Sequence, residues 1–397
     1  METQERRYST RRGWSGVAAI TASLFVFLTT ELMPIGLLTP LSTSLGTSTG
    51  TAALMVTLYG ISAGLGAPFI VAWTRRLDRR ALLTALLAVL ALGNVVTAVS
   101  PDYPLVLLTR LVTGFASGVF WAIGVSMAMR IVPERHASRA AAVVMSGISV
   151  AAVVGIPLGT VVESVTDWRS TFLIWAGLSV LALLAVAAAV PSLPPQNTVT
   201  LREVFGLPRR NARLRLVLLV VVLFVLGHFG AYTFVRPFLE GGAAATPAFI
   251  TVCLVVFGVG GAVGNAIAGW TVPRSPRTGY VVGGSGLAAT LLLLAVGRGE
   301  VAPVVLLALW GISYGITQLS QLTMTQAAAP GTFEAAMSLN TLAYNTSIAI
   351  GAFVAGLLVD GLGVTSAVWF GVALTAASVL VALSTRRTTS DEPAPTG

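Results

Sequence analysis

The feature that most constrains this chain is a succession of long apolar stretches along nearly its whole length. A membrane-spanning helix needs about 20 consecutive apolar residues. Windows of this kind lie near 14–41, 50–73, 81–99, 103–129, 138–161, 170–190, 214–238, 246–270, 278–297, 301–325, 334–358 and 363–384. Only 10% of the 397 residues are charged and 55% are hydrophobic, a balance that no soluble domain of this size needs for its core. The sequence therefore predicts an all-α membrane protein with twelve transmembrane helices.

The longest polar break divides these crossings into two sets of six. Residues 191–213 carry several prolines and arginines between the sixth and seventh crossings. We expect a cytoplasmic tail at 1–13, a six-helix bundle at 14–190, a cytoplasmic linker at 191–213, a second six-helix bundle at 214–385 and a cytoplasmic tail at 386–397. Two matched bundles are typical of carriers whose halves rock about a site near the middle of the membrane.

The placement of arginine predicts the orientation. All 24 basic residues are arginine, and 20 of them fall in the two tails and in the loops on the same side as the tails. Basic loop residues stay in the cytoplasm, so we expect both termini there, in a multi-pass protein of the plasma membrane. Basic charge this dispersed does not indicate nucleic-acid binding. The single cysteine, Cys253, excludes an internal disulfide and a cysteine-based metal site, and we expect no cofactor and no metal.

Several classes of membrane protein are disfavoured. A channel needs rings of filter residues or a continuous polar lining, and an ATP-driven pump needs a Gly-Lys-Ser/Thr phosphate loop, whereas this chain has no lysine. The signatures of an intramembrane enzyme are absent, and the tails are too short for the signalling domain of a sensor. A non-enzymatic carrier driven by an ion gradient remains.

Glu31 is the one acid well inside an apolar segment. A carboxylate removed from water is costly unless it is paired or protonated, so Glu31 is a candidate proton carrier. The alternative is a carboxyl that hydrogen-bonds a neighbouring helix, with Thr29 and Thr30 helping to bury it. Arg110, at one end of a glycine stripe in the fourth crossing, is expected to hold a buried hydrogen-bond network or to act on a nearby acid.

Three large polar residues are spaced at i, i+4 and i+8 in the seventh crossing. His228, Tyr232 and Arg236 would share one face of a continuous helix, and such groups are costly to leave facing lipid. We interpret this face as the lining of a polar cavity. The alternative for Arg236 is a position at the outer interface, paired with Glu240 four residues on.

A second polar set lies in the tenth and eleventh crossings. Neutral amides and phenols can hydrogen-bond a hydroxyl-rich solute as donors and as acceptors, although contacts between helices explain the same residues. Two residues of the first half, Asn94 and Trp121, are expected to join the cavity. The candidate substrate-binding residues are Glu31, Asn94, Trp121, His228, Tyr232, Arg236, Tyr314, Gln318, Gln321, Asn340, Tyr344 and Asn345.

Several motifs together resemble the major facilitator superfamily, in particular its drug:proton antiporter group and the bacterial sugar efflux transporters within it. They are 29–38 in the first crossing, Phe120-Trp121 in the fourth, Gly155-Ile156-Pro157-Leu158-Gly159 in the fifth, 167–172 after it and 228–238 in the seventh. The resemblance covers nearly all of 14–385. It implies the major facilitator fold and proton-coupled export by alternating access. It also implies coupling roles for Glu31, His228 and Arg110, and a conformational role for Gly155, Pro157 and Gly159.

One loop departs from the family pattern. The superfamily signature Gly-x-Leu-Ala-Asp-Arg-x-Gly-Arg-Arg aligns with 71–80, where Arg75 replaces the acid and Asp78 replaces the second glycine. The resemblance implies a conformational role for Arg75, Arg76, Asp78, Arg79 and Arg80, with Asp78 as the acid that could substitute for the missing one. Topology and contact with lipid phosphates explain these arginines as well.

We therefore predict a secondary transporter that exports a small neutral solute, a sugar or sugar analogue, in exchange for protons. Arg236 stands where relatives often carry an acid, which keeps a multidrug or chloramphenicol-type exporter as the alternative. A non-transporting sensor is the less favoured one. The expected partners are the sugar or drug-like solute, protons and membrane lipid, and we expect a monomer.

Overall fold

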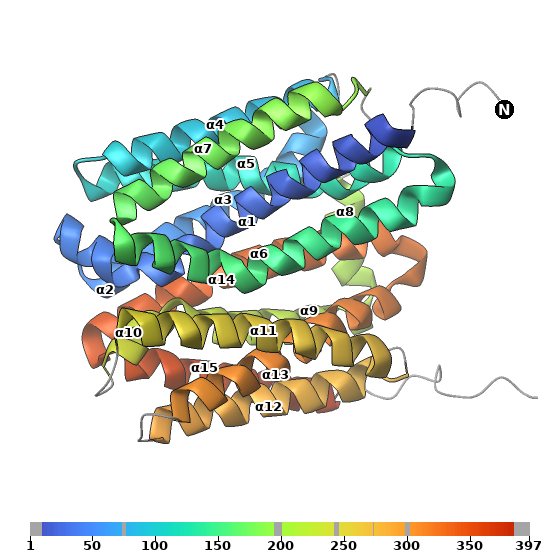
Figure 1. Ribbon diagram of the computed structural model, residues 1–397. Helices are drawn as coiled ribbons and strands as arrows, with labels where there is room; N and C mark the ends of the chain where they lie inside the picture. Colours follow the sequence, from blue (N-terminus) through green and yellow to red (C-terminus); the bar gives the residue numbers. More distant parts are fainter. Residues whose placement is uncertain are drawn as a thin grey trace, which may run out of the picture.

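The structure is a computed structural model that describes residues 10–73, 77–193, 201–241, 246–272, 274–297 and 302–384. Helices account for nearly all of these residues (Figure 1). The first half holds α1 (Thr10–Leu45), α2 (Thr49–Ala52), α3 (Leu54–Trp73), α4 (Arg79–Val99), α5 (Tyr103–Arg130), α6 (Ala137–Val165) and α7 (Trp168–Ala189). The second half holds α8 (Leu201–Arg210), α9 (Ala212–Thr233), α10 (Val235–Glu240), α11 (Pro247–Thr271), α12 (Pro276–Val296), α13 (Ala302–Ala328), α14 (Phe333–Leu362) and α15 (Thr365–Ser384).

Twelve helices of the described part are long and apolar enough to cross a membrane, which confirms the predicted number of crossings. Many begin at a short polar side chain that accepts a hydrogen bond from the backbone of the first turn, as helix N-caps do. These caps are Ser48 (α2), Asp78 (α4), Asp102 (α5), Asp167 (α7), Asn211 (α9), Thr246 (α11) and Ser275 (α12). The polar loops between apolar windows therefore also determine where the helices start.

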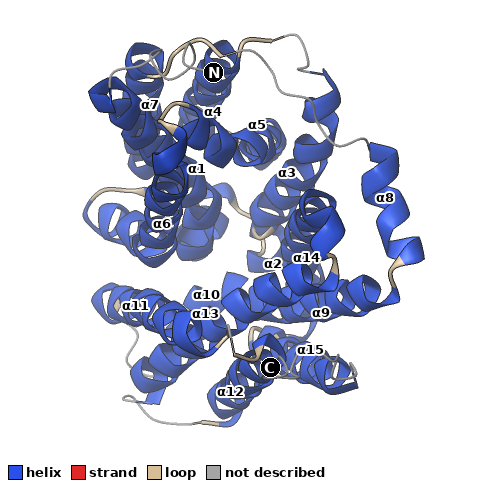
Figure 2. Cartoon of the chain, turned by 90° about the vertical axis from the view of Figure 1, so that its right-hand side faces the viewer, coloured by secondary structure: helices blue, strands red, loops and turns tan. Residues whose placement is uncertain are grey.

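The twelve helices form two bundles, each with its own hydrophobic core. One core is built from residues between 17 and 190, and the other almost entirely from residues between 214 and 382. In Figure 1 the first bundle lies above the second. The bundles meet where α3 packs against α14 and α6 packs against α11. The helix α8 packs against α14 and α9 at the periphery (Figure 2).

The predicted seventh crossing is wrong in one respect, because 214–238 is not a single helix. It is divided into α9, which ends at Thr233, and α10, which begins at Val235. Pro237 has no backbone N–H, so it cannot donate to the carbonyl of Thr233 four residues earlier. The N–H of Phe234 instead donates to the carbonyl of Ala231 at 3.2 Å, which tightens the last turn of α9.

One end of the molecule holds the C-terminal ends of α1, α6 and α14 and the start of α11, and we call it the distal end. It includes α2 and α10, at the left of Figure 1, whereas α1 begins at the opposite end. The distribution of arginine predicts that the distal end faces away from the cytoplasm.

Candidate functional site

Arg110 on α5 joins three helices of the first bundle. Its guanidinium donates hydrogen bonds to the carbonyls of Met55 at 3.3 Å, Thr30 at 3.2 Å and Glu31 at 3.4 Å. Pro34 has no N–H to offer the carbonyl of Thr30, four residues earlier in α1. Arg110 therefore supplies a donor that α1 itself lacks.

The carboxyl group of Glu31 lies near the place where the two bundles meet. Glu31 is half-buried and within electrostatic range of Arg110 and Tyr59 in its own bundle and of Tyr344 in the other. Within the part of the chain that the structure describes, both ion pairs are made by Arg236, so Glu31 takes part in neither. The sequence did not single out Tyr59, whose ring centre lies 4.3 Å from the guanidinium carbon of Arg110.

The two threonines before Glu31 are occupied by other partners. The indole Nε1 of Trp175 donates to Thr29 Oγ1 at 2.6 Å, and the amide Nδ2 of Asn94 donates to Thr30 Oγ1 at 3.5 Å. Asn94 thus holds α4 to α1 inside the first bundle. Trp121 is half-buried against the core of the same bundle.

His228 on α9 is enclosed by aromatic rings of the second bundle. Its ring centre lies within 6.1 Å of the rings of Phe224, Phe229, Tyr232, Phe257, Trp310 and Tyr314. The indole Nε1 of Trp310 donates to His228 Nδ1 at 3.1 Å, which leaves the proton of a neutral imidazole on Nε2. The sequence reasoning missed Trp310, although tryptophan requires an acceptor when it is buried.

The predicted polar set of the tenth and eleventh crossings is partly brought together on α13 and α14. The hydroxyls of Tyr314 and Tyr344 are 2.9 Å apart, and Thr325 Oγ1 donates to Asn340 Oδ1 at 3.1 Å. Asn345 is separate from this set, because its Nδ2 donates to the carbonyl of Thr341 in its own helix at 3.0 Å.

Two glutamines of α13 have polar atoms that the surrounding protein leaves unpaired. Among the described residues, Gln318 Oε1 and both amide atoms of Gln321 are buried without a hydrogen-bond partner. Gln321 is 0% exposed. A buried amide without partners costs free energy, and buried polar groups in native structures are nearly always hydrogen-bonded, so these atoms have hydrogen-bonding capacity that the protein does not use. The two side chains are therefore the strongest candidates in this set for contact with a solute.

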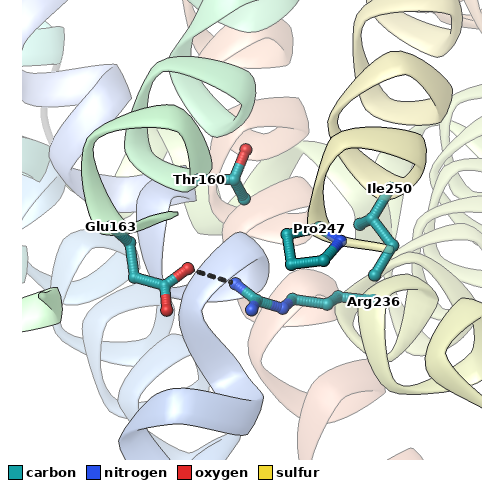
Figure 3. Close-up of a pocket in the computed structure, with 5 residues that line it drawn as sticks. All are labelled: Thr160, Glu163, Arg236, Pro247 and Ile250. Atoms are coloured by element: carbon teal, nitrogen blue, oxygen red, sulfur yellow. Dashed lines mark hydrogen bonds and ion pairs between the residues drawn. The ribbon is translucent and has the colours of Figure 1, made fainter. Parts of the chain in front are cut away.

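Arg236 lies at the distal end, away from this polar set. Its Nε bonds Glu240 at 2.8 Å and its Nη1 bonds Glu163 of α6 at 3.0 Å. Figure 3 shows Glu163 and Arg236 pointing toward one another beside Thr160, Pro247 and Ile250. The hollow that these five residues line leaves no room for a solute.

The prediction that His228, Tyr232 and Arg236 share one face of a single continuous helix is therefore wrong. His228 and Tyr232 stack with ring centres 5.4 Å apart, but the helix is interrupted before Arg236. The pairing of Arg236 with Glu240, one part of the alternative, is confirmed. The side chain is nevertheless buried and also bonds Gly36 and Glu163, so it does not extend to an exposed position. The pairing of Arg236 with Glu163, 73 positions earlier, had no signal in the sequence.

The glycines of the predicted antiporter motif allow α6 to approach α1. A Cβ atom at Gly155 would lie 2.9 Å from Thr29 Cγ2, and one at Gly159 would lie 2.8 Å from Met33 Cγ. Pro157 acts on another face of α6, because it frees the carbonyl of Val153 four residues earlier.

The loop between α3 and α4 is tied to the end of α7. Asp78 caps α4 by accepting from the N–H of Ala81 at 3.0 Å, and Ser192 Oγ donates to its carboxylate at 2.5 Å. Partial burial raises the pKa of Asp78, but the hydrogen bonds from Ser192 and from backbone N–H groups lower it by more, so the pKa lies below its ordinary value. Arg80 Nη2 donates to the carbonyl of Ala187.

Three arginines of the predicted conformational loop remain: Arg75, Arg76 and Arg79. The N–H of Arg79 donates to the carbonyl of Leu193 at 3.1 Å. Arg75 and Arg76 lie outside the described residues. Within the described residues Asp78 accepts only from hydroxyl and backbone donors, which is the role of a helix cap.

Comparison with known proteins places these features in context. A model of the Major Facilitator Superfamily matches residues 18–334 and 246–397. Proteins described as probable sugar efflux transporters in three strains of Helicobacter pylori are 30% identical over 351 residues, which is 87% of this chain and 89% of each relative. A crystal structure of a bacterial homologue of the human lysosomal transporter Spinster, inward-facing and unoccupied, has a TM-score of 0.71 at 14% identity and covers 95% of this chain and 96% of its own.

Proposed function

Since the chain belongs to the Major Facilitator Superfamily and is a multi-pass membrane transporter, we propose that it exports a small neutral solute, a sugar or sugar analogue, in exchange for protons. Export would proceed by alternating access, with the bundles at 14–190 and 214–385 as the moving units. We propose a monomer in the plasma membrane with both termini in the cytoplasm, because basic loop residues are retained there.

The observation that carries the choice of solute is the set of unpaired amide atoms on α13. Gln318 Oε1 and the amide of Gln321 lack partners within the described residues. The side chain of Gln318 also hydrogen-bonds the hydroxyl of Tyr344, which lies 2.9 Å from that of Tyr314. These groups are uncharged and include both donors and acceptors, which suits the hydroxyls of a sugar. The name of the H. pylori relatives supports the same solute class.

Glu31 is the proposed carrier of the exchanged proton. Its carboxyl is within electrostatic range of Arg110 of the first bundle and of Tyr344 of the second, so a change in its charge acts on both bundles. One proton moving inward down 100 mV supplies about 2.3 kcal/mol. At one proton per solute, this biases export by roughly fifty-fold.

The test is solute uptake into inside-out vesicles, where export appears as uptake driven by an acidic interior. We expect Glu31→Gln to abolish the dependence of uptake on the pH difference. Glu134→Gln is the matched control, because Glu134 is an exposed acid at the end of the first bundle opposite the distal end. This substitution should leave the dependence of uptake on the pH difference intact. Unaltered pH-driven uptake by Glu31→Gln would remove Glu31 from the coupling mechanism.

The second candidate is an exporter of planar apolar drugs. The dense set of rings around His228 favours it, because aromatic rings stack on flat apolar compounds. Overexpression distinguishes the two candidates. A sugar exporter protects cells against a toxic thiogalactoside, whereas a drug exporter confers resistance to chloramphenicol.

A further inference from the structure

Pro40 interrupts the hydrogen-bond ladder of α1 near the distal end. Its nitrogen carries no hydrogen, so the carbonyl of Gly36, four residues earlier, has no donor within the helix. Gly36 is buried, and a buried carbonyl without a donor is costly. Its donor is Nη1 of Arg236, which belongs to the other bundle.

Arg236 also connects two carboxylates from opposite bundles. Its Nη1 bonds Glu163 Oε2 at 3.0 Å and its Nε bonds Glu240 Oε1 at 2.8 Å. The second oxygen of Glu240 accepts from Thr39 Oγ1 of α1 at 2.5 Å. The Arg236 side chain is 8% exposed, and those of Glu163 and Glu240 are 16% and 26% exposed. Charge-assisted bonds of this kind are stronger than bonds between neutral groups. We call Gly36, Thr39, Glu163, Arg236 and Glu240 the distal latch.

The chain positions of the latch residues determine which bonds survive a separation of the bundles. Arg236 and Glu240 share α10 and move together, so their ion pair is retained. Gly36, Thr39 and Glu163 belong to the first bundle. Opening of the distal end therefore breaks the bonds of Arg236 to Gly36 and Glu163 and the bond of Thr39 to Glu240.

We propose that the distal latch holds the distal end closed, with Pro40 making the carbonyl of Gly36 available and Arg236 as the positioning residue that bonds it across the bundle interface. This role makes Arg236 a conformational group in the closed state and leaves solute contact to the residues of α13 and α14. The inference goes beyond the proposed solute and rests only on the alternating-access part of the proposed function.

The latch can be tested by disulfide cross-linking close to it. Thr160 Oγ1 of α6 and Thr251 Oγ1 of α11 are 3.3 Å apart, so cysteines at these two positions can approach bonding distance when the distal end is closed. The parent protein carries Thr160→Cys and Thr251→Cys together with Cys253→Ala, which removes the native thiol. The rate of disulfide formation under a mild oxidant reports the closed population.

We expect Arg236→Gln to slow cross-linking about tenfold, which corresponds to about 1.4 kcal/mol. Arg236→Lys should fall between Arg236→Gln and the parent, because an ammonium can pair with one carboxylate but lacks the fork that bonds three acceptors. Pro40→Ala restores a helical donor to Gly36 and should slow cross-linking by about threefold, close to 0.65 kcal/mol.

Arg169→Gln is the matched control at the same end of the molecule. Arg169 Nη1 donates to the carbonyls of Ala98 at 2.8 Å and Ser100 at 2.7 Å, all inside the first bundle, so its loss should leave the cross-linking rate unchanged. An Arg236→Gln protein that remains monodisperse and cross-links as fast as the parent overturns the proposal. If Arg236→Gln does not fold, unchanged rates in Arg236→Lys and Pro40→Ala overturn it.

The outcome is separable from that of the transport assay. A latch effect on cross-linking without sugar uptake would contradict the proposed solute and support the latch. Sugar uptake with cross-linking unaffected by these substitutions would contradict the latch alone.

Discussion

Arg110 and Pro34 are predicted to be energetically coupled, because one leaves a carbonyl free and the other donates to it. Replacing Arg110 with methionine removes the guanidinium donors from the carbonyls of Met55, Thr30 and Glu31. The carbonyls of Met55 and Glu31 keep helical donors four residues on, whereas that of Thr30 does not while residue 34 is proline. A buried carbonyl without a donor costs about 1–3 kcal/mol, and Pro34→Ala should remove most of this cost.

The measurement is a double-mutant cycle on unfolding in detergent, followed by the fluorescence of the eight tryptophans. Arg110→Met alone should lower the free energy of unfolding by about 2–4 kcal/mol, which combines lost charge-assisted bonds with the unpaired carbonyl of Thr30. In the Pro34→Ala background its effect should be about 1–2 kcal/mol smaller, within the usual range for coupled neighbours.

The control cycle pairs Arg110→Met with Pro157→Ala. Pro157 frees the carbonyl of Val153, which lies against Gly258 of α11 and does not contact Arg110. Effects in this cycle should add within about 0.5 kcal/mol. Equal additivity in the Pro34 cycle would refute the reasoning, because it would mean that Arg110 does not replace the donor that Pro34 lacks.

Three further predictions concern single residues. Gln321→Leu removes amide atoms without partners, so the free energy of unfolding of the solute-free protein should stay unchanged or rise by up to about 1 kcal/mol in thermal melts. Sugar uptake should fall at the same time. Lost stability with normal uptake would contradict a solute contact. Trp310→Phe removes the donor to His228 Nδ1 and should lower the free energy of unfolding by about 1–2 kcal/mol in thermal melts, and an unchanged melt would show that the bond contributes nothing. Asp78→Ala removes the cap of α4 and should cost about 1 kcal/mol at neutral pH. The folded pKa of Asp78 is lowered, so its charge stabilises the fold above the unfolded pKa of about 3.9. This stabilisation is lost as the pH falls through the folded pKa. The melting temperatures of the parent protein and Asp78→Ala should therefore converge at low pH.

The number of crossings could be predicted because hydropathy is summed over a whole helix, and a single polar residue changes that sum little. The break after Thr233 is different, since it depends on one missing N–H at Pro237. That signal was present in the sequence, but a proline inside a membrane helix is tolerated where neighbours satisfy the freed carbonyl. In α1, where Pro34 and Pro40 lie inside one continuous helix, neighbouring arginines do this.

The sequence identified residues of the candidate site by their chemical type, but it did not predict which residues they contact. A histidine or glutamate such as His228 or Glu31 stands out in an apolar segment whatever surrounds it. The donor to His228 is Trp310, 82 positions away, and Arg236 pairs with Glu163, 73 positions away. Which side chains meet across helices depends on the rotation of each helix about its axis, where one residue is about 100°, and on packing that no single segment encodes.

Three prolines inside α1 and α6 each leave one backbone carbonyl without a helical donor, and they differ in which group lies against that carbonyl. The carbonyl freed by Pro34 is bonded by Arg110 within the first bundle, and the one freed by Pro40 is bonded by Arg236 of the second. The carbonyl freed by Pro157 belongs to Val153, which lies so close to Gly258 of α11 that a side chain at Gly258 would collide with it. A membrane helix cannot leave such a carbonyl to water, so each proline demands a partner from a neighbouring helix. The carbonyl of Gly36 is bonded across the bundle interface and that of Val153 lies against a helix of the other bundle. The prolines that interrupt these helices therefore also help to determine where the two bundles hold together.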